Sequence, residues 1–333
     1  MPKNIIFCAD GTWDTVASNT NVVKIYRALL MNNAQFVAYD DGVGTDGTPI
    51  EKLAGAAFGA GLFKKIQNGY TKIAQVYEAG DNIFIFGFSR GAYTARSLSG
   101  MIVHCGLPTA STFGPDLVPT AFAAYRNPAL RPGLPTALAA YNMADVKITM
   151  VGVWDTVGSL GIPALFGGIE TSYQFLDTSL HPNVLNACHA VSIDERREEF
   201  PSTAWNQAPA PGQTISQVYF AGVHCDVGGG YPDSTLADIT LGWMMKKAAA
   251  AGAIFDPDIL GAFSALDSQH ALGMTHESWD PLWGYPKRRS FEPGVTLSSS
   301  VQTRCQYNPS YRPANLDLDP SGLPAASYGI STV

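Results

Sequence analysis

The chain has 333 residues, a formal net charge of -7, and only 15% charged residues. Nucleic-acid binding needs clustered lysine and arginine, and the 21 basic residues here are scattered, so nucleic acid is excluded as the main partner. The hydrophobic fraction of 46% is that of a well-packed globular protein. We expect one domain over residues 1–333, with a core at about 1–255 and a C-terminal wrap or cap at about 256–333.

The five cysteines are an odd number without CxxC spacing, which favours free thiols and folding in a reducing compartment. The N-terminus runs directly into the first predicted strand, so we expect no signal peptide. No apolar run approaches the roughly 18 residues of a membrane span. The sequence therefore predicts a cytoplasmic protein, or one exported by a route that needs no signal peptide.

Apolar runs alternate with helical patterns along the first 250 residues. The helical patterns are at residues 19–31, with Asn19 or Asn21 as N-cap, then at 62–78, after residue 91, and at 235–250. The strand-like runs are at 4–9, 35–39, 81–86, 145–154 and 217–223. This alternation predicts an α/β fold with a mostly parallel, doubly wound sheet, helices on both faces and an irregular C-terminal cap.

The segment Gly87-Phe88-Ser89-Arg90-Gly91 follows a buried strand and precedes a helix. It fits the GxSxG nucleophile elbow, in which a strained turn lifts the serine hydroxyl above the sheet. The flanking Gly87 and Gly91 lack the Cβ atoms that would clash in so tight a turn. We expect Ser89 to be a nucleophile; the alternative is a plain glycine-bordered helix start.

A serine hydroxyl is a poor nucleophile until a base takes its proton, and His224 is the predicted base. It ends a predicted strand and precedes Asp226 and a run of three glycines, where the chain can turn tightly beside a ligand. Asp226 is predicted to support the site. The other histidines favour structural roles, and these are His104, His181, His189, His270 and His276.

Asp155 ends the predicted strand that lies between those of Ser89 and His224. A carboxylate there could hold the imidazole in the required tautomer. The chain order Ser, Asp, His is that of α/β-hydrolases, so the expected fold is α/β-hydrolase-like. The rival carboxylates are Asp177, Asp194 and Asp226. Asp194 lies in the charged segment 194–199, which reads as a solvated helix or loop.

Two backbone N–H donors are expected to form an oxyanion hole. One is the N–H of Arg90, directly after the nucleophile. The other is that of Thr12 or Trp13, in the loop that Asp10 and Gly11 begin after the first strand. A purely structural turn is the alternative for that loop.

The segment Asp10-Gly11-Thr12 also resembles part of the DxDGT motif of haloacid dehalogenase phosphatases. Cys8 stands where those enzymes have the aspartate nucleophile, and a thiol cannot replace its Mg²⁺-binding carboxylate. A metal site of Asp10, Asp14, Asp41 and Asp226 lacks a recognisable ligand spacing. We therefore expect no metal and no cofactor. A non-catalytic binding or regulatory protein on a hydrolase scaffold stays an alternative.

The sequence resembles the catalytic domain of the type VI secretion lipase effectors, the Tle group, and their uncharacterised α/β-hydrolase relatives. The matching segments run in order through nearly the whole chain: FCADGTWD at 7–14, GAAFGAGLFKKIQNGY at 55–70, FGFSRGAYTAR at 86–96, VGVWDTVGSLG at 151–161, HAVSIDERREEF at 189–200, VHCDVGGGY at 223–231, and the closing segment around SVQTRCQYNPSYRPANL.

The resemblance implies an esterase or phospholipase that acts on lipid acyl esters with a Ser-Asp-His triad. The matching positions here are Ser89, Asp155 and His224. The expected partners are a lipid or small ester, a membrane surface in transient contact, and an inhibitory immunity protein. A housekeeping carboxylesterase would use the same machinery and stays an alternative to a toxin.

Overall fold

The computed structural model describes residues 2–11, 14–41, 55–157, 179–266 and 269–333. Within these residues the chain forms an eight-stranded, all-parallel sheet in the order β2-β1-β3-β4-β5-β6-β7-β8. The strands are β1 (Asn4–Ala9), β2 (Gln35–Asp40), β3 (Asn82–Phe88), β4 (Ile148–Trp154), β5 (Val184–Ser192), β6 (Thr214–Phe220), β7 (Thr296–Ser298) and β8 (Gly329–Ser331).

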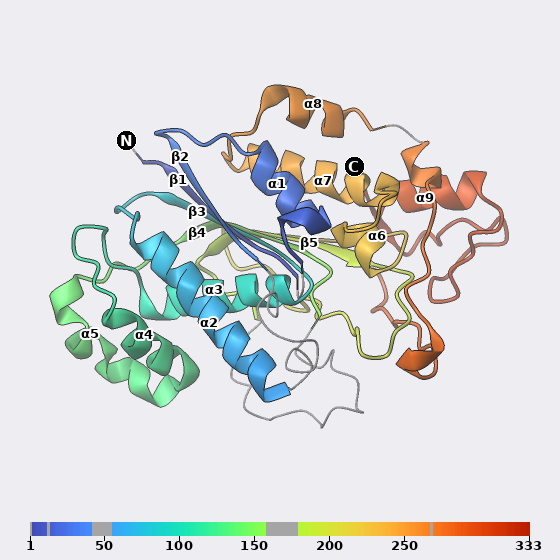
Figure 1. Cartoon of the computed structure of the whole chain (residues 1–333). Helices are drawn as coiled ribbons and strands as arrows, with labels where there is room; N and C mark the ends of the chain where they lie inside the picture. The colour runs from blue at the N-terminus through green and yellow to red at the C-terminus, as the bar shows by residue number, and fades with distance from the viewer. Residues whose placement is uncertain (1, 12–13, 42–54, 158–178, 267–268) are drawn as a thin grey trace.

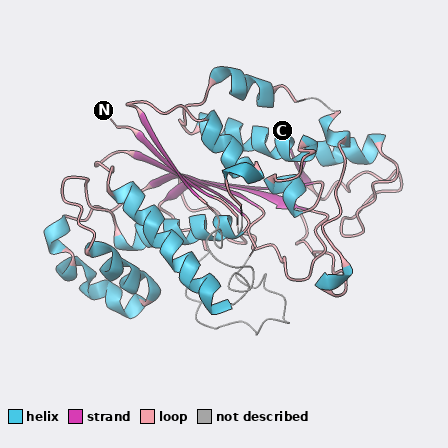
Figure 2. Ribbon diagram, in the orientation of Figure 1, coloured by secondary structure: helices cyan, strands magenta, loops and turns pink. Residues whose placement is uncertain are grey.

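Helices cover both faces of this sheet (Figures 1 and 2). On one face lie α2 (Gly55–Ala74), α3 (Arg90–Cys105), α4 (Leu117–Arg126) and α5 (Leu134–Ala137). On the other lie α1 (Asn21–Ala28), α6 (His224–Gly228), α7 (Thr235–Ala250), α8 (Pro257–Ser264) and α9 (Ser299–Tyr307). Short 3-10 helices are η1 (Val16–Ser18), η3 (Pro128–Gly133), η4 (Ala139–Tyr141), η7 (His270–Leu272) and η8 (Pro281–Trp283). This arrangement confirms the predicted doubly wound α/β-hydrolase fold.

The first strand shows why the central strands read as continuous apolar runs. Ile5 and Phe7 belong to the core on the side of α2 and α3, whereas Ile6 and Cys8 belong to the core on the side of α1 and α7. Successive side chains of a strand point to opposite faces, so a strand covered on both faces is apolar at every position. β1 and β3 therefore lie deep in the sheet, and polar residues are confined to their ends.

The structure corrects several element boundaries. The N-cap of α1 is neither Asn19 nor Asn21 but Thr20, whose hydroxyl accepts a hydrogen bond from the Val23 N–H at 3.2 Å. β6 runs over Thr214–Phe220, earlier than predicted, so His224 does not directly follow the strand but begins α6. β5 was not predicted at all, although it is the strand that lies between β4 and β6.

The segment after residue 255 contributes to the sheet as well as covering it. β7 pairs with β6, and β8 pairs with β7, both in parallel. A third apolar cluster joins this segment to the end of the sheet, and it includes Val191, Tyr219, Leu297, Val301 and Cys305. The α/β alternation thus continues through α9. No helix of the described residues combines the length and the apolarity that a bilayer crossing needs.

Gly152, in the middle of β4, tests how tightly the sheet packs against α7. A Cβ there would lie 2.7 Å from the Phe86 ring and 2.8 Å from the Met244 sulfur. We expect Gly152→Ala to lower the free energy of unfolding by about 1–3 kcal/mol, measured by urea denaturation. Gly261→Ala, in α8 with nothing within 4 Å of the new methyl group, should raise it by up to about 1 kcal/mol. Equal effects of the two substitutions would contradict this packing.

Candidate active site

Ser89 lies in a strained turn between β3 and α3. Its backbone has φ 58° and ψ -123°, a conformation that a residue with a side chain rarely adopts. The Ser89 N–H donates to the Trp154 carbonyl at 3.0 Å. A Cβ on Gly91 would lie 2.3 Å from the backbone carbonyl oxygens of Ala9 and Asp10, and one on Gly87 would lie 2.4 Å from that of Gly91. Both glycines are therefore required by the turn.

The structure brings Ser89, His224 and Asp155 into one line of hydrogen bonds. His224 Nε2 lies 2.8 Å from Ser89 Oγ, and His224 Nδ1 lies 2.5 Å from Asp155 Oδ2. All three side chains are buried, with exposed fractions of 6%, 4% and 0% for Ser89, His224 and Asp155. The imidazole is thus held on one side by a carboxylate and faces a serine hydroxyl on the other.

The Asp155 carboxylate is fully paired. Its Oδ1 accepts from the Ser192 N–H at 2.9 Å and from Arg289 Nη1 at 2.6 Å, and its Oδ2 accepts from Arg289 Nη2 at 2.9 Å besides His224. Burial alone would raise the pKa of this carboxyl. The Arg289 guanidinium and the hydrogen bond from His224 outweigh burial and hold that pKa well below its usual range. Asp155 is therefore an anion at any working pH.

The His224 imidazole lies against two aromatic rings. The Phe88 ring is 4.6 Å from it between centroids, and the Phe200 ring is 5.1 Å from it in an edge contact. Burial lowers the pKa of His224, against the raising effect of the hydrogen bond to Asp155. The imidazole is neutral at neutral pH, which is the state that can accept a proton from a hydroxyl.

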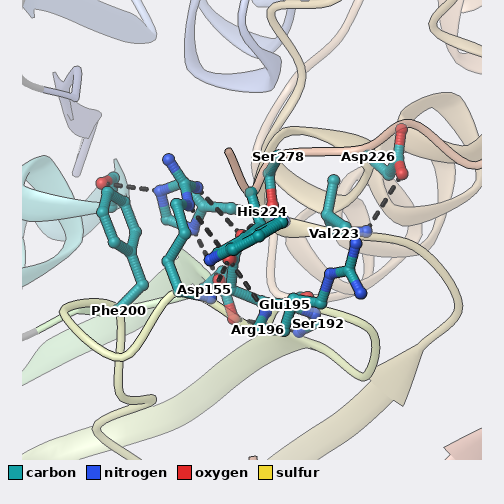
Figure 3. Close-up of polar contacts among 12 residues, drawn as sticks. Asp155, Ser192, Glu195, Arg196, Phe200, Val223, His224, Asp226 and Ser278 are labelled. Carbon is teal, nitrogen blue, oxygen red and sulfur yellow. Dashed lines mark hydrogen bonds and ion pairs between the residues drawn. The ribbon is translucent and has the colours of Figure 1, made fainter. Parts of the chain in front are cut away.

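The charged segment 194–199 lies only partly in solvent, contrary to the prediction: Glu198 is exposed, but Glu195 is not. Figure 3 shows Glu195 beside His224 and Asp155, and its side chain is fully buried. Glu195 accepts the His224 backbone N–H at 3.2 Å and two hydrogen bonds from the Arg197 guanidinium, at 3.0 and 2.9 Å. Burial would raise the pKa of Glu195, but Arg197 lowers it to about 2. Glu195 thus anchors the start of α6, and with it His224.

Residues of the C-terminal segment hold this charged segment from outside. Ser278 Oγ donates to both Glu195 oxygens, at 3.1 and 3.0 Å. Glu277 forms an ion pair with Arg196. The Lys287 N–H donates to the Arg196 carbonyl at 2.7 Å. The segment from residue 277 to 289 therefore lies along residues 195–200, next to the candidate triad.

Asp226, predicted to support the site, makes two sets of contacts. Its Oδ2 accepts from the backbone N–H groups of Val223 at 3.0 Å and of His276 at 3.1 Å. Its Oδ1 lies 2.5 Å from His276 Nδ1, and the Tyr231 ring stacks on the His276 imidazole at 4.0 Å. Asp226 thus joins the first turn of α6 to the C-terminal segment. Figure 3 shows its contact with Val223.

The loop after β1 approaches the nucleophile. A Cβ on Gly11 would lie 3.4 Å from Ser89 Cβ and 2.3 Å from Asp14 Oδ2, so Gly11 itself lies directly beside Ser89. Burial raises the pKa of Asp14 to about 7 and that of Asp10 to about 6. The oxyanion candidates Thr12 and Trp13 lie outside the described residues. Arg90 is the first residue of α3, next to Ser89.

The aspartates considered above as an alternative metal site do not form a cluster in the described part of the chain. Asp10 is engaged by the Thr20 hydroxyl at 2.9 and 2.8 Å, by the Tyr39 hydroxyl at 2.6 Å and by the Gly11 N–H at 2.8 Å. No group of three or more His, Cys, Asp or Glu side chains there is arranged to hold a metal ion. The rival carboxylate Asp177 lies outside the described residues.

Sequence reasoning missed Arg289, Glu195 and Ser192 as members of this site. Arg289 stands in an irregular segment, 134 positions from Asp155. Ser192 ends the unpredicted β5, and its backbone N–H carries no sequence signal. The available signal for Glu195 was its position within HAVSIDERREEF, one of the segments that carries the family resemblance.

An all-parallel sheet with a serine at a strained strand-to-helix turn, hydrogen-bonded to a histidine and an aspartate, defines an α/β-hydrolase. The chain belongs to the family of type VI secretion system (T6SS) phospholipase effector Tle1-like catalytic domains, whose model matches residues 3–247.

Three related proteins illustrate the range of similarity. An uncharacterised protein of Saccharomyces cerevisiae is 29% identical over 245 residues, which covers 65% of this chain and 35% of the yeast protein. The chain thus spans about a third of the length of that relative. The crystal structure of an uncharacterised Pseudomonas aeruginosa protein has a TM-score of 0.46 at 16% identity, covering 83% of this chain and 51% of that one. The Tle1 effector bound to the VgrG spike has a TM-score of 0.41 at 16% identity, covering 70% and 52%.

His189, which is not the candidate base, contacts the backbone next to Asp155. Its Nε2 accepts the Thr156 N–H at 3.1 Å, next to Asp155, and its Nδ1 bonds Gln217 at 3.0 Å. Complete burial, aided by the charge of Arg96, lowers its pKa to about 3. His189 is therefore neutral in the folded protein, whereas the unfolded chain protonates it below its ordinary pKa of 6.5.

We expect His189 to make the fold lose stability as the pH falls from 6.5 toward 3, because only the unfolded state gains the proton there. The slope contributed is at most about 1.4 kcal/mol per pH unit. His189→Gln, which keeps an acceptor for Thr156, should lack this contribution. Urea denaturation of both proteins at pH 4.5, 5.5 and 7.5 should therefore show the wild-type advantage shrinking as the pH falls. A difference that is constant with pH would contradict the neutral state of His189.

Proposed function

We propose that the chain is a serine hydrolase that cleaves lipid acyl esters, with Ser89 as nucleophile, His224 as general base and Asp155 orienting the imidazole. The proposal is carried by the line of hydrogen bonds from Ser89 Oγ through His224 to Asp155 at a strained elbow. Membership of a family described as phospholipase effector catalytic domains supports a lipid substrate. A smaller soluble ester is the alternative substrate of the same site.

In the acylation step, Ser89 Oγ attacks the acyl carbonyl carbon while its proton passes to Nε2 of His224. The neutral imidazole that burial favours is the form that can accept this proton. Asp155 accepts a hydrogen bond from the Nδ1–H of His224, which fixes the tautomer and stabilises the imidazolium while Asp155 stays ionised. His224 then protonates the leaving alcohol oxygen, the C–O bond of the ester breaks, and the acyl group stays on Ser89.

In the deacylation step, water attacks the acyl carbon and gives a proton to His224, which returns it to Ser89 Oγ as the free acid leaves. Both tetrahedral intermediates carry a negative oxygen. We assign its stabilisation to the backbone N–H of Arg90, the first residue of α3, and to that of Thr12 or Trp13. Because Gly11 has no side chain, its backbone can lie close to Ser89.

The family also suggests the setting in which the chain works. We propose a lipid substrate presented at a membrane surface, an inhibitory immunity protein as a partner, and export without a signal peptide. The chain spans about a third of its yeast relative, so the substrate, partner and export route of a whole protein are proposed here from the family alone.

Ser89→Ala should lower ester turnover at least about a thousandfold and abolish labelling by a fluorophosphonate probe. Hydrolysis is measured on a p-nitrophenyl ester series and on phospholipid vesicles in parallel, and the ratio of the two rates separates a phospholipase from a soluble esterase. Ser97→Ala is the matched control, because Ser97 is a buried serine of α3, the helix that follows Ser89, and its hydroxyl has no hydrogen-bond partner among the described residues. Full activity in Ser89→Ala would refute the proposed nucleophile.

Asp155→Asn should lower kcat by about 10⁴-fold with little change in KM, because an amide can hold the imidazole in the wrong tautomer. Asp194→Asn is the control, since Asp194 is a half-buried carboxylate that binds the Gly222 N–H and the Tyr311 hydroxyl and not the His224 imidazole. Both variants are compared by thermal unfolding. Equal loss of activity in the two would mean that Asp155 has a structural role alone.

A further inference from the structure

Arg289 belongs to the C-terminal segment, beyond the residues 3–247 that the family model matches. Its side chain is buried, and the guanidinium reaches the carboxylate that holds His224. Nη1 and Nη2 donate to the two oxygens of Asp155, at 2.6 and 2.9 Å. The remaining donors bond the Ser192 carbonyl at 3.0 Å and the Phe200 carbonyl at 3.1 and 2.7 Å. The guanidinium is thus held in one plane by two backbone segments of the core.

This geometry does two things to Asp155. A two-pronged contact from a rigid guanidinium fixes the plane of a carboxylate, which a single hydrogen bond cannot do. Arg289 therefore determines the orientation in which Asp155 accepts the hydrogen bond from His224 Nδ1. Arg289 also places a positive charge next to Asp155, the anion that stabilises the protonated form of His224. This positive charge offsets part of the electrostatic effect of Asp155 on the imidazole.

Besides Asp155, the charged groups that act on the His224 imidazole are Glu195 and Arg197, and these two form an ion pair. Asp226, in the same helix as His224, is paired with His276, and Asp14 is a further titratable group in the loop next to Ser89. Glu195 faces the start of α6 and is neutralised by Arg197, whose guanidinium also lies 3.6 Å from the centre of the Phe200 ring. His189, which accepts the N–H of Thr156 next to Asp155, is neutral in the folded protein. Removal of Arg289 would therefore leave Asp155 as the unbalanced charge of this group.

We propose that Arg289 is a positioning residue, which fixes the Asp155 carboxylate against His224 and moderates the negative charge that the imidazole faces. The C-terminal segment thereby completes the site that the family-matched core begins. This inference rests on the proposed serine hydrolase function, and it concerns how the base of that site is tuned.

The test compares Arg289→Gln, Arg289→Lys and Arg304→Gln in the full chain. Arg304 is the matched control, because it is a buried arginine of the same C-terminal segment that binds the carbonyls of Ala271 and Gly273 and does not contact Asp155. Two quantities are measured: the pH profile of kcat/KM on a p-nitrophenyl ester, and the titration of the His224 imidazole by NMR. Circular dichroism establishes that each variant is folded.

In Arg289→Gln, Asp155 loses its positively charged partner, so its negative charge should stabilise the protonated form of His224 more strongly. The acidic limb of the profile and the NMR titration should then move to higher pH, by about one unit. kcat should fall about 10²-fold because the carboxylate is no longer fixed, while KM stays near the wild-type value. Arg289→Lys keeps the positive charge but loses the two-pronged contact of the guanidinium with Asp155. The acidic limb of its kcat/KM profile should therefore stay in place, while kcat falls at least tenfold. Arg304→Gln should change stability and leave the acidic limb where it is.

An unmoved limb and titration in a folded Arg289→Gln would overturn the proposal, as would an equal shift in Arg304→Gln. If Arg289→Gln does not fold, Arg289→Lys decides: wild-type kcat in that variant would refute the positioning role. The NMR titration needs no turnover, so it judges Arg289 even if the wild type hydrolyses no ester. Lack of both turnover and fluorophosphonate labelling in the wild type would instead defeat the proposed function.

Discussion

The site depends on one buried anion, the carboxylate of Asp155. An isolated charge in a protein interior costs many kcal/mol unless it is paired and hydrogen-bonded. Here the partners come from three places: His224 at the start of α6, the Ser192 backbone at the end of β5, and Arg289 from the C-terminal segment. Each of the three partners stabilises the buried carboxylate, so the geometry of the site is tied to the completion of the fold.

The parallel sheet is what allows these partners to meet. Adjacent parallel strands end at the same edge, so β3 delivers Ser89, β4 delivers Asp155 and β5 delivers Ser192 to neighbouring positions. The strain at Ser89 and the positive φ of 37° at Asp155 are concentrated at that edge. The tight packing around Gly87 and Gly91 holds these conformations, which makes the rigid sheet the support of a strained site.

The C-terminal segment, which lies outside the family match, supplies part of the site. The matched residues 3–247 contain the serine, the aspartate and the histidine, but not the groups that fix Asp155, Glu195 and Asp226 from the other side. Arg289, Ser278 and His276 supply those contacts. Two further strands of the same segment extend the sheet. The segment is therefore bound to the core both through the sheet and through the charges of the site.

The sequence by itself determined the strands β1, β2, β3 and β4, because each is a continuous apolar run. It determined the turn at Ser89 through the GxSxG pattern. The three candidate residues could be chosen because each is a polar residue near the end of a predicted strand. It could not determine β5, the burial of Glu195 or the role of Arg289. β5 carries a histidine and an asparagine that find partners on other strands, and a charged residue reads as exposed until its counter-ion is known. Arg197, the counter-ion of Glu195, is only two residues away, but the His224 N–H and Ser278 that also bind Glu195 are distant along the chain. Arg289 is likewise distant from Asp155, so only the tertiary structure decides which charges are buried.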